Sequence, residues 1–239
     1  MIDRSQRNAA RVAAVTYPLT FLISAIAFYR LYVPLLVLNN TAATIRNFAA
    51  HEQTFRVYLA ATLAYGVGVM VLLTALYVVL KPISQGLALF ATLCRLAYAL
   101  MWFAQLLDLL GALRAVGGAG YLQVFDSERL QALASLQRAS GGDAYYVGLG
   151  FYGLGTVVFG YLWFESGYVP RLLAAWGILS SLFMGFCAFA YLLFPSFGTI
   201  VSVNWYEIPV ALFELGISAW ILAKGLPSPG TMKAAEAMS

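Results

Sequence analysis

Three polar side chains interrupt an apolar stretch that is long enough to cross a bilayer. The stretch runs from Leu87 to Leu110, LALFATLCRLAYALMWFAQLLDLL, and contains Arg95, Gln105 and Asp108. A charge that faces lipid costs a few kcal/mol even on the mildest insertion scale, so such residues usually face a bundle interior and mark a pairing or a site. The rest of the chain must therefore supply polar partners for this stretch.

The composition places the chain in a membrane. Of its 239 residues, 62% are hydrophobic and 10% are charged, and the mean hydropathy is +0.81. A soluble domain is only about 45 to 50% apolar. The net charge of +4 would indicate nucleic-acid binding in a soluble protein, but here most Lys and Arg residues flank apolar runs, where they act as topology signals and contact lipid head groups. We expect membrane lipids as partners and no nucleic acid.

The apolar runs predict an all-α membrane protein with about six transmembrane helices. The predicted spans cover residues 12–32, 55–80, 87–110, 145–164, 172–194 and 205–222. The turn from Lys81 to Ser84 is so short that the second and third spans must be antiparallel neighbours. Asp126 is a suitable N-cap for a short amphipathic helix on the outer side of the bundle. We expect a single transmembrane domain over residues 1–224 and a disordered tail over residues 225–239.

About six spans place both termini on the same side of the membrane. The first apolar run follows Arg4, Arg7 and Arg11, which favours a cytoplasmic N-terminus. The basic residues are otherwise divided almost evenly between the two sides. With the N-terminus inside, the long polar loops lie outside, where their charges have less influence on topology.

A count of residues along each span gives the approximate depth of its charges, since a helix rises about 1.5 Å per residue. Arg95 and Glu214 each lie about ten residues from the cytoplasmic end of their span. Asp108 lies near the outer end of the third span, and Arg56 lies at the outer start of the second. The depths predict one ion pair between Arg95 and Glu214 and another between Arg56 and Asp108.

These pairs extend into a predicted polar seam inside the bundle. Glu207 lies seven residues before Glu214 and shares its helix face, which places Glu207 near Trp102 and Gln105. Two interpretations of the seam remain open at this stage. Its charges either form static ion pairs that fix the helix register, or they form a ligand or proton site.

The residue types exclude several kinds of chemistry. The only histidine, His51, lies beside Glu52 in an outer loop, so a bis-histidine haem is excluded and a histidine-rich zinc site is disfavoured. No lysine lies inside a predicted span, and the chain has neither a phosphate-binding glycine loop nor a nucleophile motif. We expect no cofactor, no metal site and no catalytic residue, and interpret His51 and Glu52 as outer-loop groups.

Several segments resemble a known family. They are TAATIRNFAAHEQTFR from Thr41 to Arg56, the LY...KP turn from Leu76 to Pro82, and FYGLGTVVFGYLWFESGYVP from Phe151 to Pro170. These segments are similar to the bacterial membrane family catalogued as domain of unknown function 4386. The matching residues are Asn47, Glu52, Phe55, Arg56, Arg95, Gly153, Gly160, Tyr161, Ser166, Gly167, Pro170 and Arg171. The resemblance covers nearly all of the chain and implies a six-helix bacterial membrane protein with no established activity. We expect it in the cytoplasmic membrane.

Three functions are compatible with these observations. The first is a non-enzymatic membrane protein that binds a lipid-like or small amphiphilic ligand, or that serves as an accessory subunit of a membrane partner. The second is a small secondary transporter that uses Glu214 or Glu207 for proton coupling. Similar turns at Lys81 to Ile83 and at Tyr168 to Arg171 are compatible with the inverted repeat of such transporters. The third is an intramembrane enzyme.

Overall fold

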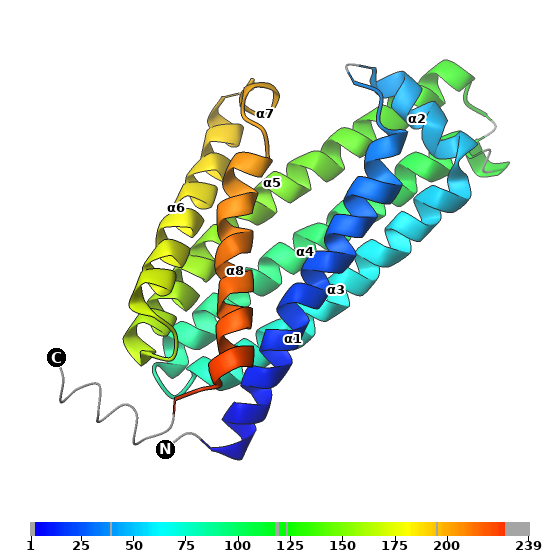
Figure 1. Cartoon of the computed structure of the whole chain (residues 1–239). Coiled ribbons are helices and arrows are strands. Elements are labelled where there is room, and N and C mark those ends of the chain that lie inside the picture. The colour runs from blue at the N-terminus through cyan, green and yellow to red at the C-terminus, as the bar shows by residue number, and fades with distance from the viewer. Residues whose placement is uncertain (1–2, 39, 118–119, 123, 195, 228–239) are drawn as a thin grey trace. The chain divides into compact units, whose positions relative to one another are not determined.

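The computed structural model describes residues 3–38, 40–117, 120–122, 124–194 and 196–227, and every regular element in these ranges is helical (Figure 1). Within the described residues, six helical segments are long and apolar enough to cross a membrane. They are Arg4–Leu35, Glu52–Leu80, Gln85–Val116, Ser127–Ser166, Arg171–Leu193 and Asn204–Lys224. The predicted all-α class and the six spans are confirmed, and the chain is a multi-pass membrane protein.

The first span changes its helical geometry before it ends. Helix α1 (Arg4–Ile26) continues into a π-helical segment, η1 (Ala27–Tyr32), and then into a 3₁₀ turn, η2 (Val33–Leu35). Pro34 lies in that turn and cannot donate a backbone hydrogen bond, so it cannot extend the helix. The backbone becomes extended at Leu36, four residues after the predicted end of the first span.

Two polar segments outside the predicted spans are helical. The polar segment before His51, predicted to be part of an outer loop, forms α2 (Thr41–Ala50), and the side chain of Asn40 accepts a hydrogen bond from Ala43 N at 2.9 Å. The separate amphipathic helix predicted after Asp126 is wrong, because it forms the first turns of α5 (Ser127–Ser166), a continuous helix of 40 residues. Asp126 caps that helix, since its Oδ1 accepts a hydrogen bond from Arg129 N at 2.8 Å. The stretch after the cap contains no proline, so nothing in it forces the helix to stop.

The remaining elements include the predicted tight hairpin. They are α3 (Glu52–Leu80), α4 (Gln85–Val116), η3 (Gly120–Leu122), α6 (Arg171–Leu193), α7 (Phe197–Ile200) and α8 (Asn204–Lys224). Helices α3 and α4 are joined by the turn after Leu80, and the Cβ atom that an alanine would add at Gly66 of α3 would lie 2.4 Å from the ring of Phe103 in α4. The predicted packing of the second span against the third is therefore confirmed.

The described residues form two compact units. Unit 1 comprises the described residues within Met1–Leu19, Gly68–Tyr98 and Leu149–Ser239, and unit 2 comprises those within Thr20–Val67 and Ala99–Gly148. Helices α1, α3, α4 and α5 contribute residues to both units. The single domain predicted over residues 1–224 stays a prediction. Residues 228–239, most of the predicted tail, lie outside the described residues.

Unit 2 is held together by stacked aromatic rings. Phe48 of α2 and Phe55 of α3 are fully buried, and their ring centroids lie 4.1 Å apart with nearly parallel planes. Tyr32 of η1 stacks on Tyr58 of α3 at 4.7 Å. Offset stacking of this kind adds about 0.5 to 1.5 kcal/mol per pair beyond the burial of the rings. The stack joins η1, α2 and α3 into one cluster.

Unit 1 depends on close approaches between helices. Helices α6 and α8 run side by side (Figure 1), and Trp176 Nε1 of α6 donates to the Pro209 carbonyl of α8 at 2.9 Å. Gly153 of α5 faces the backbone of α6, where an added Cβ would lie 2.8 Å from both Gly185 N and Ser181 O. Small residues at such contacts let membrane helices pack closely, and packing is their main source of stability in lipid.

Substitution of Gly153 by alanine should destabilise unit 1. The new methyl group would meet backbone atoms of α6 that have no freedom to rotate away, and we expect a loss of about 1 to 3 kcal/mol in the free energy of unfolding. Gly150→Ala is the matched control on the same helix, because the nearest atom to its added Cβ is the Ala188 side chain at 3.9 Å. Reversible unfolding in mixed micelles gives the free energy of unfolding of both variants. Equal stabilities would show that α5 and α6 are not in close contact.

One end of unit 1 gathers both the start of α1 and the end of α8 (Figure 1). The side-chain amide of Gln6 in α1 donates to the Val79 carbonyl at 2.8 Å and to the Tyr168 hydroxyl at 3.0 Å. Trp220 Nε1 of α8 donates to the Tyr168 carbonyl at 3.1 Å. The basic residues of this end are Arg4, Arg7, Arg11, Lys81, Arg171 and Lys224.

Candidate functional site

Arg95 is the most deeply buried charged residue that the structure describes, with 2% of its surface exposed. It lies within α4, in unit 1. Its Nη1 atom donates to Glu214 Oε1 of α8 at 2.8 Å and to Thr156 Oγ1 of α5 at 2.7 Å. The structure thus brings together Arg95 and Glu214, the two residues whose depths match in the sequence, and adds a hydroxyl that the sequence analysis did not select.

Tyr152 connects both members of the ion pair. Its hydroxyl donates to Glu214 Oε1 at 2.6 Å, and its ring lies 3.8 Å from Arg95 Cζ. A guanidinium over an aromatic face gains roughly 0.5 to 2 kcal/mol, the larger value when it is shielded from water. We call Arg95, Tyr152, Thr156 and Glu214 the Arg95 cluster.

A glycine lets the cluster form. Tyr152 and Thr156 lie one turn apart on α5, and Gly155 lies between them. A Cβ at Gly155 would lie 2.9 Å from both Ala91 O and Arg95 Cγ. The absence of a side chain at this residue therefore permits the backbone of α5 to approach α4 and the stem of Arg95 to pass beside it.

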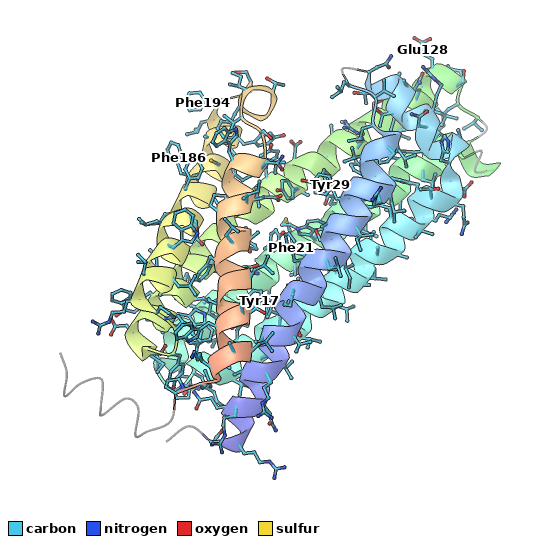
Figure 2. All side chains as sticks on the ribbon, in the orientation of Figure 1. Tyr17, Phe21, Tyr29, Glu128, Phe186 and Phe194 are labelled. Atoms are coloured by element: carbon cyan, nitrogen blue, oxygen red, sulfur yellow. The ribbon has the colours of Figure 1, made fainter. Side chains whose placement is uncertain are left out.

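Two more tyrosines flank the Arg95 cluster. The ring of Tyr98, one turn after Arg95 on α4, meets the ring of Tyr152 edge to face at 4.8 Å between centroids. Tyr17 of α1, labelled in Figure 2, is 3% exposed and lies near enough for the charges of Arg95 and Glu214 to act on its hydroxyl. The Ser218 hydroxyl of α8 donates to the Ala14 carbonyl and so fixes α8 against this part of α1. Four helices of unit 1 therefore surround the charges.

The second predicted pair, Arg56 with Asp108, has other partners in unit 2. Arg56 Nε donates to Glu52 Oε1 at 2.7 Å, and both side chains are about half exposed. Glu52 lies one turn before Arg56 on the same face of α3, so it is within reach without any contact between helices. Asp108 Oδ2 instead accepts a hydrogen bond from Ser140 Oγ of α5 at 2.9 Å. The depth count matched Arg56 with Asp108 but could not show these nearer partners.

The other predicted members of the seam are divided between the units. Trp102 and Gln105 belong to unit 2, where the ring of Trp102 lies 4.9 Å from that of Tyr65 and the side chain of Gln105 faces Gly141. Glu207 is partly buried at the start of α8 in unit 1. The predicted proximity of Glu207 to Trp102 and Gln105 stays a prediction.

His51 lies between α2 and α3 in unit 2. It is exposed, and its Nδ1 lies 3.2 Å from the Asn47 carbonyl in the last turn of α2. Its neighbour Glu52 is the partner of Arg56. Among the residues that the structure describes, no three His, Cys, Asp or Glu side chains gather where they could hold a metal ion.

The uncharged members of the cluster were not predicted from the sequence. Thr156 lies ten residues before Ser166, the last residue of α5, and Arg95 lies ten residues after Gln85, the first residue of α4. The depth count that matched Arg95 with Glu214 would have placed Thr156 at the same level. It was applied only to charged residues, so hydroxyl groups were not considered.

Replacing Thr156 by valine should weaken the cluster slightly. The change keeps the side-chain shape but removes the acceptor of one Arg95 hydrogen bond. We expect a loss of no more than about 1 kcal/mol in the free energy of unfolding. Arg95 keeps its bond to Glu214, and hydrogen bonds between membrane helices average below that value. The control is Thr74→Val, where an exposed hydroxyl bonds only to Met70 O of its own helix. Equal stability of Thr156→Val and the native chain would contradict the contact.

The Arg95 cluster is a charge-balanced polar site at a membrane-spanning depth. Its guanidinium is almost fully covered, whereas the Glu214 side chain is 17% exposed. The cluster offers hydrogen-bonding groups and aromatic faces in a region where lipid offers neither.

Comparison with known proteins identifies a family. The model of the family described as "Domain of unknown function (DUF4386)" matches residues 12–225, a range that includes the complete Arg95 cluster. No curated protein and no solved structure matches the chain.

Proposed function

The chain belongs to the DUF4386 family of unknown function, and on that premise we propose that it is a non-enzymatic membrane protein that binds a small amphiphilic ligand at the Arg95 cluster. The cluster lies within membrane-spanning helices, so a ligand that reaches it from the bilayer needs an apolar part. It also needs a polar group, because the cluster is charged and hydrogen-bonding.

The unequal burial of the ion pair carries this proposal. Arg95 is 2% exposed and Glu214 is 17% exposed, so the pair presents one accessible carboxylate to its surroundings. A buried ion pair is weak evidence of stabilisation, because apolar residues of the same volume often stabilise a fold equally well. Charges inside membrane segments are rare and usually mark functional sites. We therefore favour a binding site over a purely structural pair.

The tyrosines give the site an amphipathic character. Tyr17, Tyr98 and Tyr152 are each less than a tenth exposed. A tyrosine presents an apolar ring with a polar hydroxyl at one end, which suits contact with the boundary between the apolar chain and the head group of a ligand.

Native mass spectrometry tests this proposal. The protein purified from its membrane should carry a bound non-protein mass, and Tyr152→Phe, which removes the hydroxyl that contacts Glu214, should reduce the bound fraction severalfold. Tyr161→Phe is the matched control, because Tyr161 lies on the same helix and is 45% exposed. The absence of any bound mass from the native chain would refute the proposal.

Proton-coupled secondary transport is the second candidate, and the construction of α8 favours it. Pro209 lies inside α8, and Gly216 follows Glu214 on the same helix. Transporters often use helices interrupted by proline or glycine beside an intramembrane carboxylate. This function requires proton-dependent uptake into vesicles that Glu214→Gln abolishes. Uptake that is the same in both chains would exclude it.

The location follows from the distribution of charge. The end of unit 1 that holds the start of α1 and the end of α8 carries the six basic residues named above. Arg4, Arg7 and Arg11, which precede the first span, favour a cytoplasmic N-terminus. Together with the resemblance to a bacterial family, they support a bacterial cytoplasmic membrane with both termini inside. Figure 2 shows Phe186 on α6 and Phe194 directly after its last residue, and these side chains are 68% and 60% exposed. We expect them to contact lipid or a membrane partner. Protease protection of a tag at either terminus in inside-out vesicles would contradict this orientation.

A further inference from the structure

Both members of the ion pair in the Arg95 cluster have a group that could form a further hydrogen bond. Glu214 Oε1 accepts both the Arg95 and the Tyr152 hydrogen bonds, so the pair is joined through one oxygen only. Buried Arg–carboxylate pairs often form two parallel hydrogen bonds instead. Arg95 Nε is buried and has no hydrogen-bond partner among the described residues.

The open groups are one donor and one acceptor. The buried N–H of Arg95 Nε lacks an acceptor, and a buried donor left without a partner is costly. The Glu214 carboxylate is partly exposed, and both of its hydrogen bonds within the described residues are to Oε1, which leaves Oε2 able to accept another. A molecule that satisfies both groups must bring an acceptor and a donor.

The charge of the site decides which molecules qualify. The guanidinium and the carboxylate already balance each other, so an anionic or cationic head group would leave an uncompensated charge at membrane depth. Such a charge would weaken binding by about a hundredfold. A neutral head group avoids this cost.

From these contacts we infer that the ligand is an amphiphile whose neutral head group both donates and accepts hydrogen bonds, such as a monoacylglycerol or a fatty amide. The inference rests on the proposed binding function and defines the chemistry of its ligand. Arg95 Nε donates to the head group, and Glu214 Oε2 accepts from it.

Competition between amphiphiles with a common dodecyl chain tests the inference. The full chain in nanodiscs is mixed with monododecanoylglycerol, methyl dodecanoate, dodecanoate or dodecyltrimethylammonium, and native mass spectrometry measures the bound fraction. Monododecanoylglycerol should bind about tenfold better than the methyl ester, which lacks a donor, and about a hundredfold better than either ion.

The Glu214→Gln variant tests the role of the carboxylate. It keeps the shape of the side chain but can turn a donating NH₂ group toward the head group, so the preference for monododecanoylglycerol over the methyl ester should fall to nearly one. Glu52→Gln, at the exposed pair with Arg56, is the control that should keep the native preference.

The outcomes separate this inference from the binding function itself. Tighter binding of either ion, or equal binding of the glycerol ester and the methyl ester to the native chain, overturns the head-group inference but leaves ligand binding intact. A water molecule as the only occupant beside Arg95 Nε in an experimental map of the ligand-soaked protein also overturns it. Failure of all four probes to bind, together with no co-purified mass, refutes the proposed function as well.

Discussion

Glu214→Leu should destabilise the protein by about 3 to 5 kcal/mol, because it leaves a buried guanidinium without its counter-charge. Arg95 is 2% exposed and cannot move its charge to water without opening the contacts of α4 with α5. Arg95→Met should cost less, since the Glu214 carboxylate that remains is 17% exposed and keeps its hydrogen bond from Tyr152. Unfolding of the single and double variants in mixed micelles gives the coupling energy of the pair.

The double variant removes both charges and so tests whether an unpaired charge causes the loss. With both charges replaced by apolar groups, the free energy of unfolding of Arg95→Met/Glu214→Leu should lie within about 2 kcal/mol of that of the native chain. Glu52→Leu is the control at a half-exposed pair, where the loss should not exceed about 1 kcal/mol. A Glu214→Leu variant as stable as the control would contradict the buried ion pair.

Trp163→Ala should cost about 3 kcal/mol, because Trp163 is the largest fully buried side chain of the described residues. The value lies at the low end of the range for tryptophan because lipid is as apolar as the interior of the bundle, so the loss comes from packing contacts. Trp163 belongs to unit 1, and its ring meets that of Tyr168 at 6.4 Å between centroids. Reversible unfolding in mixed micelles measures this loss in the free energy of unfolding.

Two further substitutions separate packing from hydrogen bonding at Trp163. Its Nε1 atom has no hydrogen-bond partner within the described part of the chain. Trp163→Phe should therefore lose less than half of the unfolding free energy that Trp163→Ala loses. Trp205→Ala removes the same group from a residue that is 72% exposed and should change stability by less than about 0.5 kcal/mol. Similar losses for Trp163→Ala and Trp205→Ala would contradict the burial of Trp163.

The helices were predictable because their signals are local. Apolar runs longer than the bilayer is thick define the spans, and Lys81 to Ser84 leaves no room for anything but a hairpin. The unbroken length of α5 is not evident from the sequence, because Gly141 and Gly142 lie between the predicted short helix and the predicted fourth span. Glycine weakens a helix without ending it, and here Gly141 lies against Gln105 and Asp108 of α4.

Of the residues in the Arg95 cluster, the sequence predicted only the two charged ones. Depth alone matched Arg95 with Glu214, since a buried charge inside a membrane needs a counter-charge at its own level. Depth does not specify which face of a helix a residue occupies, so it also matched Arg56 with Asp108, although Glu52 lies closer to Arg56 along α3. The roles of Tyr152 and Thr156 depend on the approach of α5 to α4 at Gly155, which is a property of the packed helices.

The central claim is that the Arg95 cluster binds a ligand and does not serve only to join helices. Quantitative extraction followed by mass spectrometry, expressed as small molecules per chain, tests it most directly in Arg95→Met/Glu214→Leu, because this variant is expected to stay folded. We expect about one amphiphile per native chain and almost none in the folded double variant. The same amphiphile at the native amount in the double variant would contradict the claim and make the ion pair purely structural.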